Sequence, residues 1–84
     1  MIYAYDRTAS AGIRARLADG LAAIGVTVVR PDGEPFDPSR QEAGGVQPTQ
    51  DAALHDRIAE TERVGFADGE RLIREPVVVV YRRR

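Results

Sequence analysis

Apolar residues in the first third of the chain recur at the spacing of a helix. They lie four, four and three positions apart, which places them on one helical face: Ile13, Leu17, Leu21 and Ile24. Ser10 stands where a helix cap is expected, and Gly25 can end the helix because glycine tolerates the left-handed backbone conformation. Tyr3 and Tyr5 belong to an earlier turn, which residues 8–12 interrupt. We therefore predict a helical segment over residues 1–24.

Beyond Gly25 the pattern changes to short apolar runs separated by turn-forming residues. The clearest run is Val77 to Tyr81, which Pro76 precedes at a strand start or edge, and Asp68-Gly69 has the chemistry of a tight hairpin turn. Other extended segments are expected at residues 26–29, 41–46 and 58–66, with loops at 31–38 and 48–54, and a bend at Gly44-Gly45. The fold class is mainly β: an N-terminal helix followed by a small antiparallel β roll or barrel. The β domain spans residues 25–84.

Composition narrows the classes of function. The chain of 84 residues has room for one domain, and it lacks cysteine, which excludes a disulfide framework and a thiolate metal site. Its longest apolar run is too short to cross a bilayer, and no secretion signal is visible, so we expect a cytoplasmic protein without membrane contact. The net charge of -1 argues against general nucleic-acid binding. The three terminal arginines, Arg82 to Arg84, are interpreted as a solvated end.

Residues that could carry catalysis are scarce. His55 is the single histidine and stands among charged residues that suggest an exposed loop. Glu60 and Glu62 share one face of a strand and are interpreted as a solvated face, because a paired acid and base needs a cleft. There is no phosphate-binding glycine loop and no nucleophile elbow. We predict a protein-binding domain that is not an enzyme and has no cofactor and no metal.

Several short motifs, in order, resemble the C-terminal head domain of GrpE, the nucleotide exchange factor of the DnaK chaperone. Phe36-Asp37-Pro38, followed after two residues by Gln41-Glu42-Ala43, is similar to the family's F-D-P-x-x-H-E-A. Gly65-Phe66 is similar to its Gly-Tyr, and residues 71–74 are similar to its arginine, two apolar residues and second arginine. Together these motifs extend the resemblance over residues 25–81.

The resemblance implies adenine nucleotide exchange on a DnaK-type chaperone, through binding of its ATPase domain. The family's chaperone-contacting arginine corresponds to Arg71, and a family contact position corresponds to Val80. The full set of partner-binding candidates is Arg71, Arg74, Val80, Phe36, Asp37 and Pro38. Phe36, Asp37 and Pro38 have an alternative role that does not involve a partner. They can form a packed turn in which the Asp37 carboxylate accepts a hydrogen bond from a nearby backbone N–H. For Arg71 and Arg74 the alternative is a surface ion pair, and for Val80 the alternative is a core position.

Departures from the family pattern leave other hypotheses open. Gln41 replaces the usual histidine, and about two dozen residues precede Gly25, where the family carries a long dimerising helix. The family's habit and the small core favour a homodimer through the helical stripe. One alternative function is a regulatory or structural paralogue that binds without exchanging nucleotide. Another is a nucleic-acid-binding β module that uses the terminal arginines.

Overall fold

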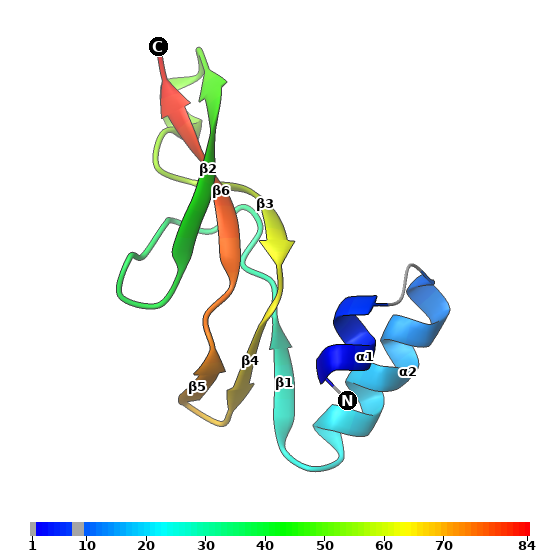
Figure 1. Cartoon of the computed structure of the whole chain (residues 1–84). Coiled ribbons are helices and arrows are strands. Elements are labelled where there is room, and N and C mark those ends of the chain that lie inside the picture. The colour runs from blue at the N-terminus through cyan, green and yellow to red at the C-terminus, as the bar shows by residue number, and fades with distance from the viewer. Residues whose placement is uncertain (1, 8–9) are drawn as a thin grey trace.

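The computed structural model describes residues 2–7 and 10–84 (Figure 1). Two helices come first, α1 (Ile2–Arg7) and α2 (Ala11–Ala22). The remaining elements are β1 (Val26–Val29), β2 (Glu42–Thr49), the 3-10 turn η1 (Ala52–Leu54), β3 (Ile58–Arg63), β4 (Gly65–Asp68), β5 (Arg71–Arg74) and β6 (Val77–Arg83). The predicted order of helix first and strands afterwards is confirmed. The earlier turn predicted around Tyr3 and Tyr5 is the short helix α1. The sequence also predicts an interruption at residues 8–12, of which Thr8 and Ala9 lie outside the described residues.

Helix α2 begins where its sequence predicts, and it ends at Ala22, two residues earlier than predicted. The Ser10 hydroxyl accepts a hydrogen bond from the Ile13 N–H at 3.3 Å, which satisfies one of the donors that a helix start leaves unpaired. At the other end Gly25 has a φ of 85°, in the left-handed region that glycine tolerates. The predicted apolar stripe is covered only in part. Leu21 is 3% exposed, but Ile24 is 70% exposed.

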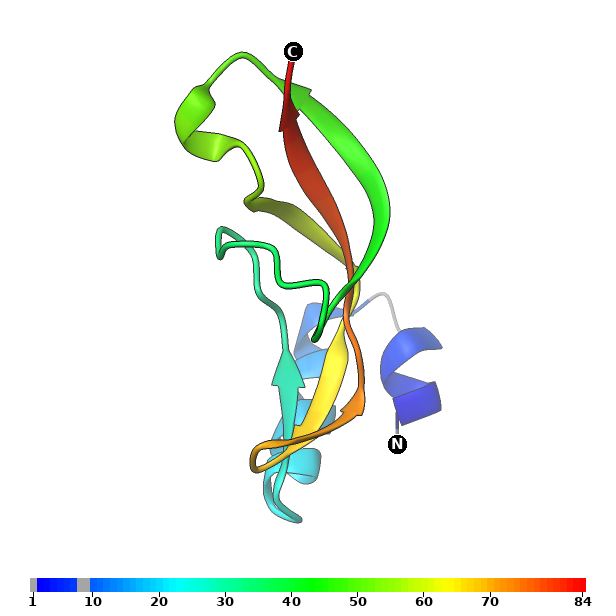
Figure 2. The same cartoon turned by 90° about the vertical axis from the view of Figure 1, so that its left-hand side faces the viewer.

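The strands form two three-stranded sheets, with the orders β1-β4-β5 and β2-β6-β3. The first sheet is antiparallel throughout. In the second, β3 runs antiparallel to β6, but β2 runs parallel to it. The two sheets do not close into a barrel (Figure 2). The sequence prediction of an antiparallel roll or barrel is therefore wrong in two details, the parallel pair and the closure.

Strand β2 is longer than predicted and takes in residues expected to form a loop. It continues through Pro48 to Thr49, and Pro48 is paired in register with Arg82. Proline is tolerated here because β2 is an edge strand. The predicted bend at Gly44-Gly45 is confirmed by a register shift between Ala43 and Gly45. A Cβ atom on Gly44 would lie 2.6 Å from a methyl of Val77, so a larger residue cannot take this position without movement.

The β4–β5 hairpin turns at Gly69 and Glu70, one residue later than the predicted Asp68-Gly69, because Asp68 is the last residue of β4 and is paired with Arg71. Gly69 has a φ of 59°, which a tight two-residue turn requires. At the other end of β4, a Cβ atom on Gly65 would lie 2.6 Å from the Arg74 carbonyl oxygen and 2.8 Å from the Pro76 nitrogen. Glycine at position 65 therefore lets two backbone segments approach each other closely.

The apolar core is split into two clusters of buried residues. One joins helix to sheet through Leu21, Val64 and Phe66, with Ile2, Tyr5, Val26 and Val28 packed around them. The other lies in the second sheet and contains Ile58, Val78 and Val80, with Phe36 packed against them. Both clusters are small, as expected of a chain of this length.

The C-terminal arginines are exposed, in agreement with a solvated end, but their backbone is part of the fold. Arg82 and Arg83 lie in β6, and the Arg84 N–H donates to the Thr49 carbonyl at 3.1 Å. The Arg82 guanidinium also forms an ion pair with Asp56. Strand pairing with β2 fixes their backbone. No helix in residues 2–7 and 10–84 has the length and apolar character needed to cross a membrane.

Candidate functional site

The tip of the β4–β5 hairpin presents Arg71 to solvent. It is the first residue of β5 and is paired with Asp68 across the turn. Exposure alternates along β5, so Arg71 and Ile73 are exposed while Leu72 and Arg74 are half-buried. Within the described residues the Arg71 guanidinium takes part in no ion pair. A free guanidinium near an exposed isoleucine, 48% accessible, is chemistry suited to binding a protein.

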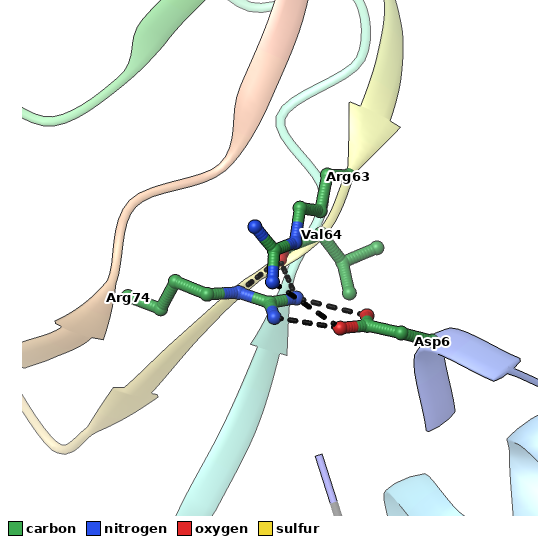
Figure 3. A network of polar contacts seen from close by, with 4 residues as sticks. All are labelled: Asp6, Arg63, Val64 and Arg74. Atoms are coloured by element: carbon green, nitrogen blue, oxygen red, sulfur yellow. Dashed lines mark hydrogen bonds and ion pairs between the residues drawn. The ribbon is translucent and has the colours of Figure 1, made fainter. Parts of the chain in front are cut away.

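Arg74 stands at the other end of β5, where its partly buried side chain forms a network with Asp6, Arg63 and Val64 (Figure 3). Its Nη1 and Nη2 atoms donate to the two carboxylate oxygens of Asp6 at 2.8 and 3.0 Å. Its Nε and Nη2 atoms also donate to the Val64 carbonyl, at 3.2 and 2.6 Å. The guanidinium carbon lies 4.7 Å from the centre of the Phe66 ring, a cation–π distance. The surface ion pair that the sequence offered as an alternative is thus formed, in partly buried surroundings.

Asp6 is the centre of this network. The hydrogen bonds from Arg74 hold the pKa of its carboxyl below the ordinary value, although desolvation acts in the opposite direction. Arg63 adds a second positive charge, with its Nη2 atom 3.5 Å from an Asp6 oxygen. The network ties helix α1 to the β3–β4 junction and to β5. Sequence reasoning did not identify Asp6, which carries no local signal for such a role.

Val80 and Phe36 come together in the second core cluster. Val80 has no exposed surface, so its side chain cannot reach a partner in this conformation. Phe36 is half-buried against the same cluster, and its N–H donates to the Asp56 carbonyl at 2.8 Å. Both residues therefore pack in the core cluster. For Val80 this is the core position that the sequence offers as the alternative to partner binding. A contact with a partner stays a prediction for Phe36.

The loop after Phe36 forms the predicted turn around Asp37. One carboxylate oxygen of Asp37 accepts from the Ser39 N–H at 3.0 Å and from the Ser39 hydroxyl at 2.6 Å. The bond from the Ser39 side chain is the main reason why the pKa of Asp37 is lowered. The Asp37 N–H donates to the Gln41 side-chain oxygen at 2.8 Å, so the residue that departs from the family pattern closes the loop. Asp37 and Pro38 are exposed.

His55 is partly exposed and has a structural partner. Its Nδ1 atom accepts a hydrogen bond from the Arg83 N–H at 3.0 Å, and its Nε2 atom lies 3.4 Å from an Asp56 oxygen. Glu60 and Glu62 are both exposed, in agreement with the solvated face expected for them. Across residues 2–7 and 10–84, histidine and carboxylate side chains form no group of three that could hold a metal ion.

A groove that the sequence did not reveal lies between the helices and the β3–β4 junction. It has a volume of about 580 Å³ and is open on one side. Four arginines line it, and they are Arg7, Arg14, Arg30 and Arg63. These arginines are far apart in the sequence, so no motif or run of charged residues predicts the groove.

The two sheets and the preceding helices are consistent with a GrpE head-like fold. The family model GrpE matches residues 10–82. Two curated relatives, each named Protein GrpE, come from Trichormus variabilis and from a Nostoc species. Each is 35% identical over 69 residues, which cover 82% of this chain and 27% of the relative. The chain belongs to the GrpE family, and it spans about a quarter of the length of these relatives.

Proposed function

We propose that this chain is an adenine nucleotide exchange factor that binds the ATPase domain of a DnaK-type chaperone and promotes release of ADP. The observation that carries the proposal is the GrpE family match over residues 10–82. The motifs quoted from the sequence lie within that range. In this proposal the protein acts by binding, and none of its groups reacts with the nucleotide. Its cytoplasmic location and its division into a helical segment, residues 1–24, and a β head, residues 25–84, stay predictions.

The mechanism is a shift of population in the chaperone. The head binds the ATPase domain better when its nucleotide cleft is open than when it is closed, and ADP leaves faster from the open state. A binding protein shifts such an equilibrium only as far as its affinities for the two states differ. The head therefore needs a rigid surface. The paired strands β4 and β5 supply one next to Arg71.

Arg71 is the central contact in this proposal. Its guanidinium is exposed and unpaired among the described residues, so binding does not require breaking an existing ion pair. Asp37 and Pro38 are also exposed and remain candidates for contact. Arg74 acts mainly by holding β5 in place through its bonds to Asp6 and Val64. The exposed Ile13 and Ile24 on and after α2 are candidates for the homodimer contact.

The test is release of a fluorescent ADP analogue from a DnaK-type chaperone of the same organism. Adding the chain is expected to accelerate release. Arg71→Glu is expected to weaken binding by roughly 30-fold, because loss of a charged anchor at an interface costs on the order of 2 kcal/mol or more. The matched control is Arg16→Glu, at an exposed position on α2, which should retain activity. If the wild-type chain binds the chaperone and release does not accelerate, the exchange proposal is wrong.

One observation favours a second candidate, a regulatory paralogue that binds without exchanging nucleotide. Helix α1 lies outside the family match and engages Arg74, an arginine of a family motif, through Asp6. A family arginine occupied in this way is less available to a chaperone. Binding without acceleration of ADP release supports this candidate. Acceleration by the wild-type chain rejects it.

A further inference from the structure

The groove between the helices and the sheet is more positive than the rest of the molecule. Its lining contains four arginines and two carboxylates, Asp6 and Glu62, whereas the whole chain has a net charge of -1. Asp6 is already bound by Arg74, which is not part of the lining. Asp6 also lies 3.5 Å from Arg63, one of the four lining arginines, and Arg30 lies 3.7 Å from Asp32, so two of the four guanidinium groups already have an acidic neighbour. The lining still holds four positive and two negative side chains. Positive charge gathered in a recess attracts anions more strongly than the same charge spread over a surface.

The arrangement of the arginines favours an extended ligand over a single ion. Arg7 ends α1, Arg14 lies on α2, Arg30 follows β1 and Arg63 ends β3, so the four charges enter from four different elements. A volume of about 580 Å³ is also far larger than one small anion fills. Several separate positive groups in a recess of this size match a ligand with several separate negative groups.

The chemistry of the lining favours carboxylates carried on a peptide. Guanidinium groups bind carboxylates through two parallel hydrogen bonds, and the Arg74–Asp6 pair shows this geometry within the same chain. Tyr5 and Val64 add apolar surface to the wall, against which the aliphatic part of a glutamate side chain can pack. A groove with both kinds of surface is suited to a short acidic segment of a protein.

The geometry points to a binding site for an acidic peptide segment of a protein partner in this groove. The site is separate from the Arg71 surface. Helix α1 supplies Tyr5, Asp6 and Arg7 to it, and α1 lies outside the residues that match the GrpE family. The groove therefore depends in part on residues outside the segment that matches the family model. It goes beyond the proposed nucleotide exchange and does not depend on it.

Binding of a fluorescein-labelled poly-glutamate peptide to the full chain, followed by anisotropy at low ionic strength, tests the proposal. Saturable binding is expected that weakens as salt is added. The double variant Arg14→Gln, Arg30→Gln should weaken it by about tenfold or more, because two charged contacts are lost. The matched control, Arg16→Gln with Arg40→Gln, removes equal charge outside the groove and should change binding by less than about twofold.

Both variants are checked by thermal unfolding, and the single variant Arg30→Gln replaces the double one if that does not fold. Arg30 suits this purpose because its side chain is half exposed and its Asp32 partner is 3.7 Å away. In nuclear magnetic resonance spectra of the wild-type chain, the peptide should shift the amide signals of Tyr5 and Val64 before those of residues 82–84. Arg71→Glu should leave peptide binding unchanged, which separates this proposal from nucleotide exchange.

Five results would overturn the proposal, and four of them concern binding of the peptide itself. They are no saturable binding, equal binding of a poly-glutamine peptide, equal loss of binding in the control variant, and signal shifts confined to the C-terminal arginines. Displacement of the peptide by pyrophosphate at the same concentration as by free poly-glutamate would also reject a peptide site. It would show a site for small anions instead.

Discussion

The two sheets of this small domain complete their cores in different ways. The first sheet places Phe66 against two helices and adds polar contacts around it, with Arg74 over the ring and Tyr5 at its edge, 5.7 Å between ring centres. In the second sheet, the partly buried residue that packs against the core cluster, among those that the structure describes, comes from a loop. This residue is Phe36, whose ring covers Ile58 and Val80.

The difference shows how a short chain stabilises strands that cannot bury enough surface alone. Helices and an ion pair secure the first sheet, so its stability depends on charges at Asp6 and Arg74. A loop held by hydrogen bonds secures the second, so its stability depends on the packing of Phe36 and the turn at Asp37. Substitutions in the two regions should therefore differ in size and in their response to pH.

The largest effect is expected from Phe66→Ala in the first sheet. Phe66 is fully buried, and replacing a buried phenylalanine with alanine costs roughly 3–5 kcal/mol. The ring contacts with Tyr5 and Arg74 are lost as well. Urea unfolding followed by circular dichroism measures the change. Phe66→Leu keeps most of the apolar volume and should cost clearly less; an equal loss in both variants would contradict the packing argument.

A smaller effect is expected from Phe36→Ala in the second sheet. Because Phe36 is only half-buried, its loss should cost about 1–2 kcal/mol, below the value for full burial of a large apolar side chain. The same unfolding experiment compares it with Phe66→Ala. If the two alanine variants are equally destabilised, the loop ring is as important as the buried ring, and the contrast between the sheets fails.

The ion pair gives the first sheet a dependence on pH. Hydrogen bonds from Arg74 depress the pKa of Asp6 in the folded chain, so the folded state favours the ionised carboxyl. This stabilisation is fully present above the unfolded pKa, near pH 4, and is lost as the pH falls through the lower folded value. Asp6→Asn should cost about 1 kcal/mol at neutral pH, since the pair is partly exposed.

The difference in stability between wild type and Asp6→Asn should therefore shrink as the pH falls below about 4. Thermal unfolding over a pH series measures it. Asp19→Asn, an exposed carboxylate on α2, serves as the control and should show no such convergence. A constant difference between wild type and Asp6→Asn at every pH would show that the ionised state of Asp6 contributes nothing to folding.

The smallest effect on stability is expected from Arg71→Glu. Its guanidinium makes no ion pair within the described chain, and exposed charges contribute about 0–1 kcal/mol. The melting temperature should change little while chaperone binding falls as proposed above. Arg74→Gln should behave in the opposite way and lower the melting temperature. A large loss of stability in Arg71→Glu would make Arg71 a structural residue.

Local sequence was sufficient for the elements that depend on a few neighbouring residues. Ser10 and Gly25 bound helix α2, Gly69 turns the β4–β5 hairpin, and Asp37 folds back on Ser39. Each of these features depends on contacts or backbone angles within a few positions. The order of helix and strands and the family motifs could also be predicted, because they too depend on residues that are close together in the sequence.

Contacts between distant residues decided the rest. Asp6 and Arg74 are 68 positions apart, and nothing near either residue indicates that they meet. Strands β2 and β6 pair in parallel, and the chain between them contains β3, β4 and β5. The direction of this pairing therefore cannot be predicted from the residues of either strand. Val80 alternates in the sequence as a contact residue or a core residue would, and only the packing of Ile58 and Phe36 shows that it is buried. The arginine groove is likewise a product of the tertiary structure, because four separate elements must assemble before their charges share one recess.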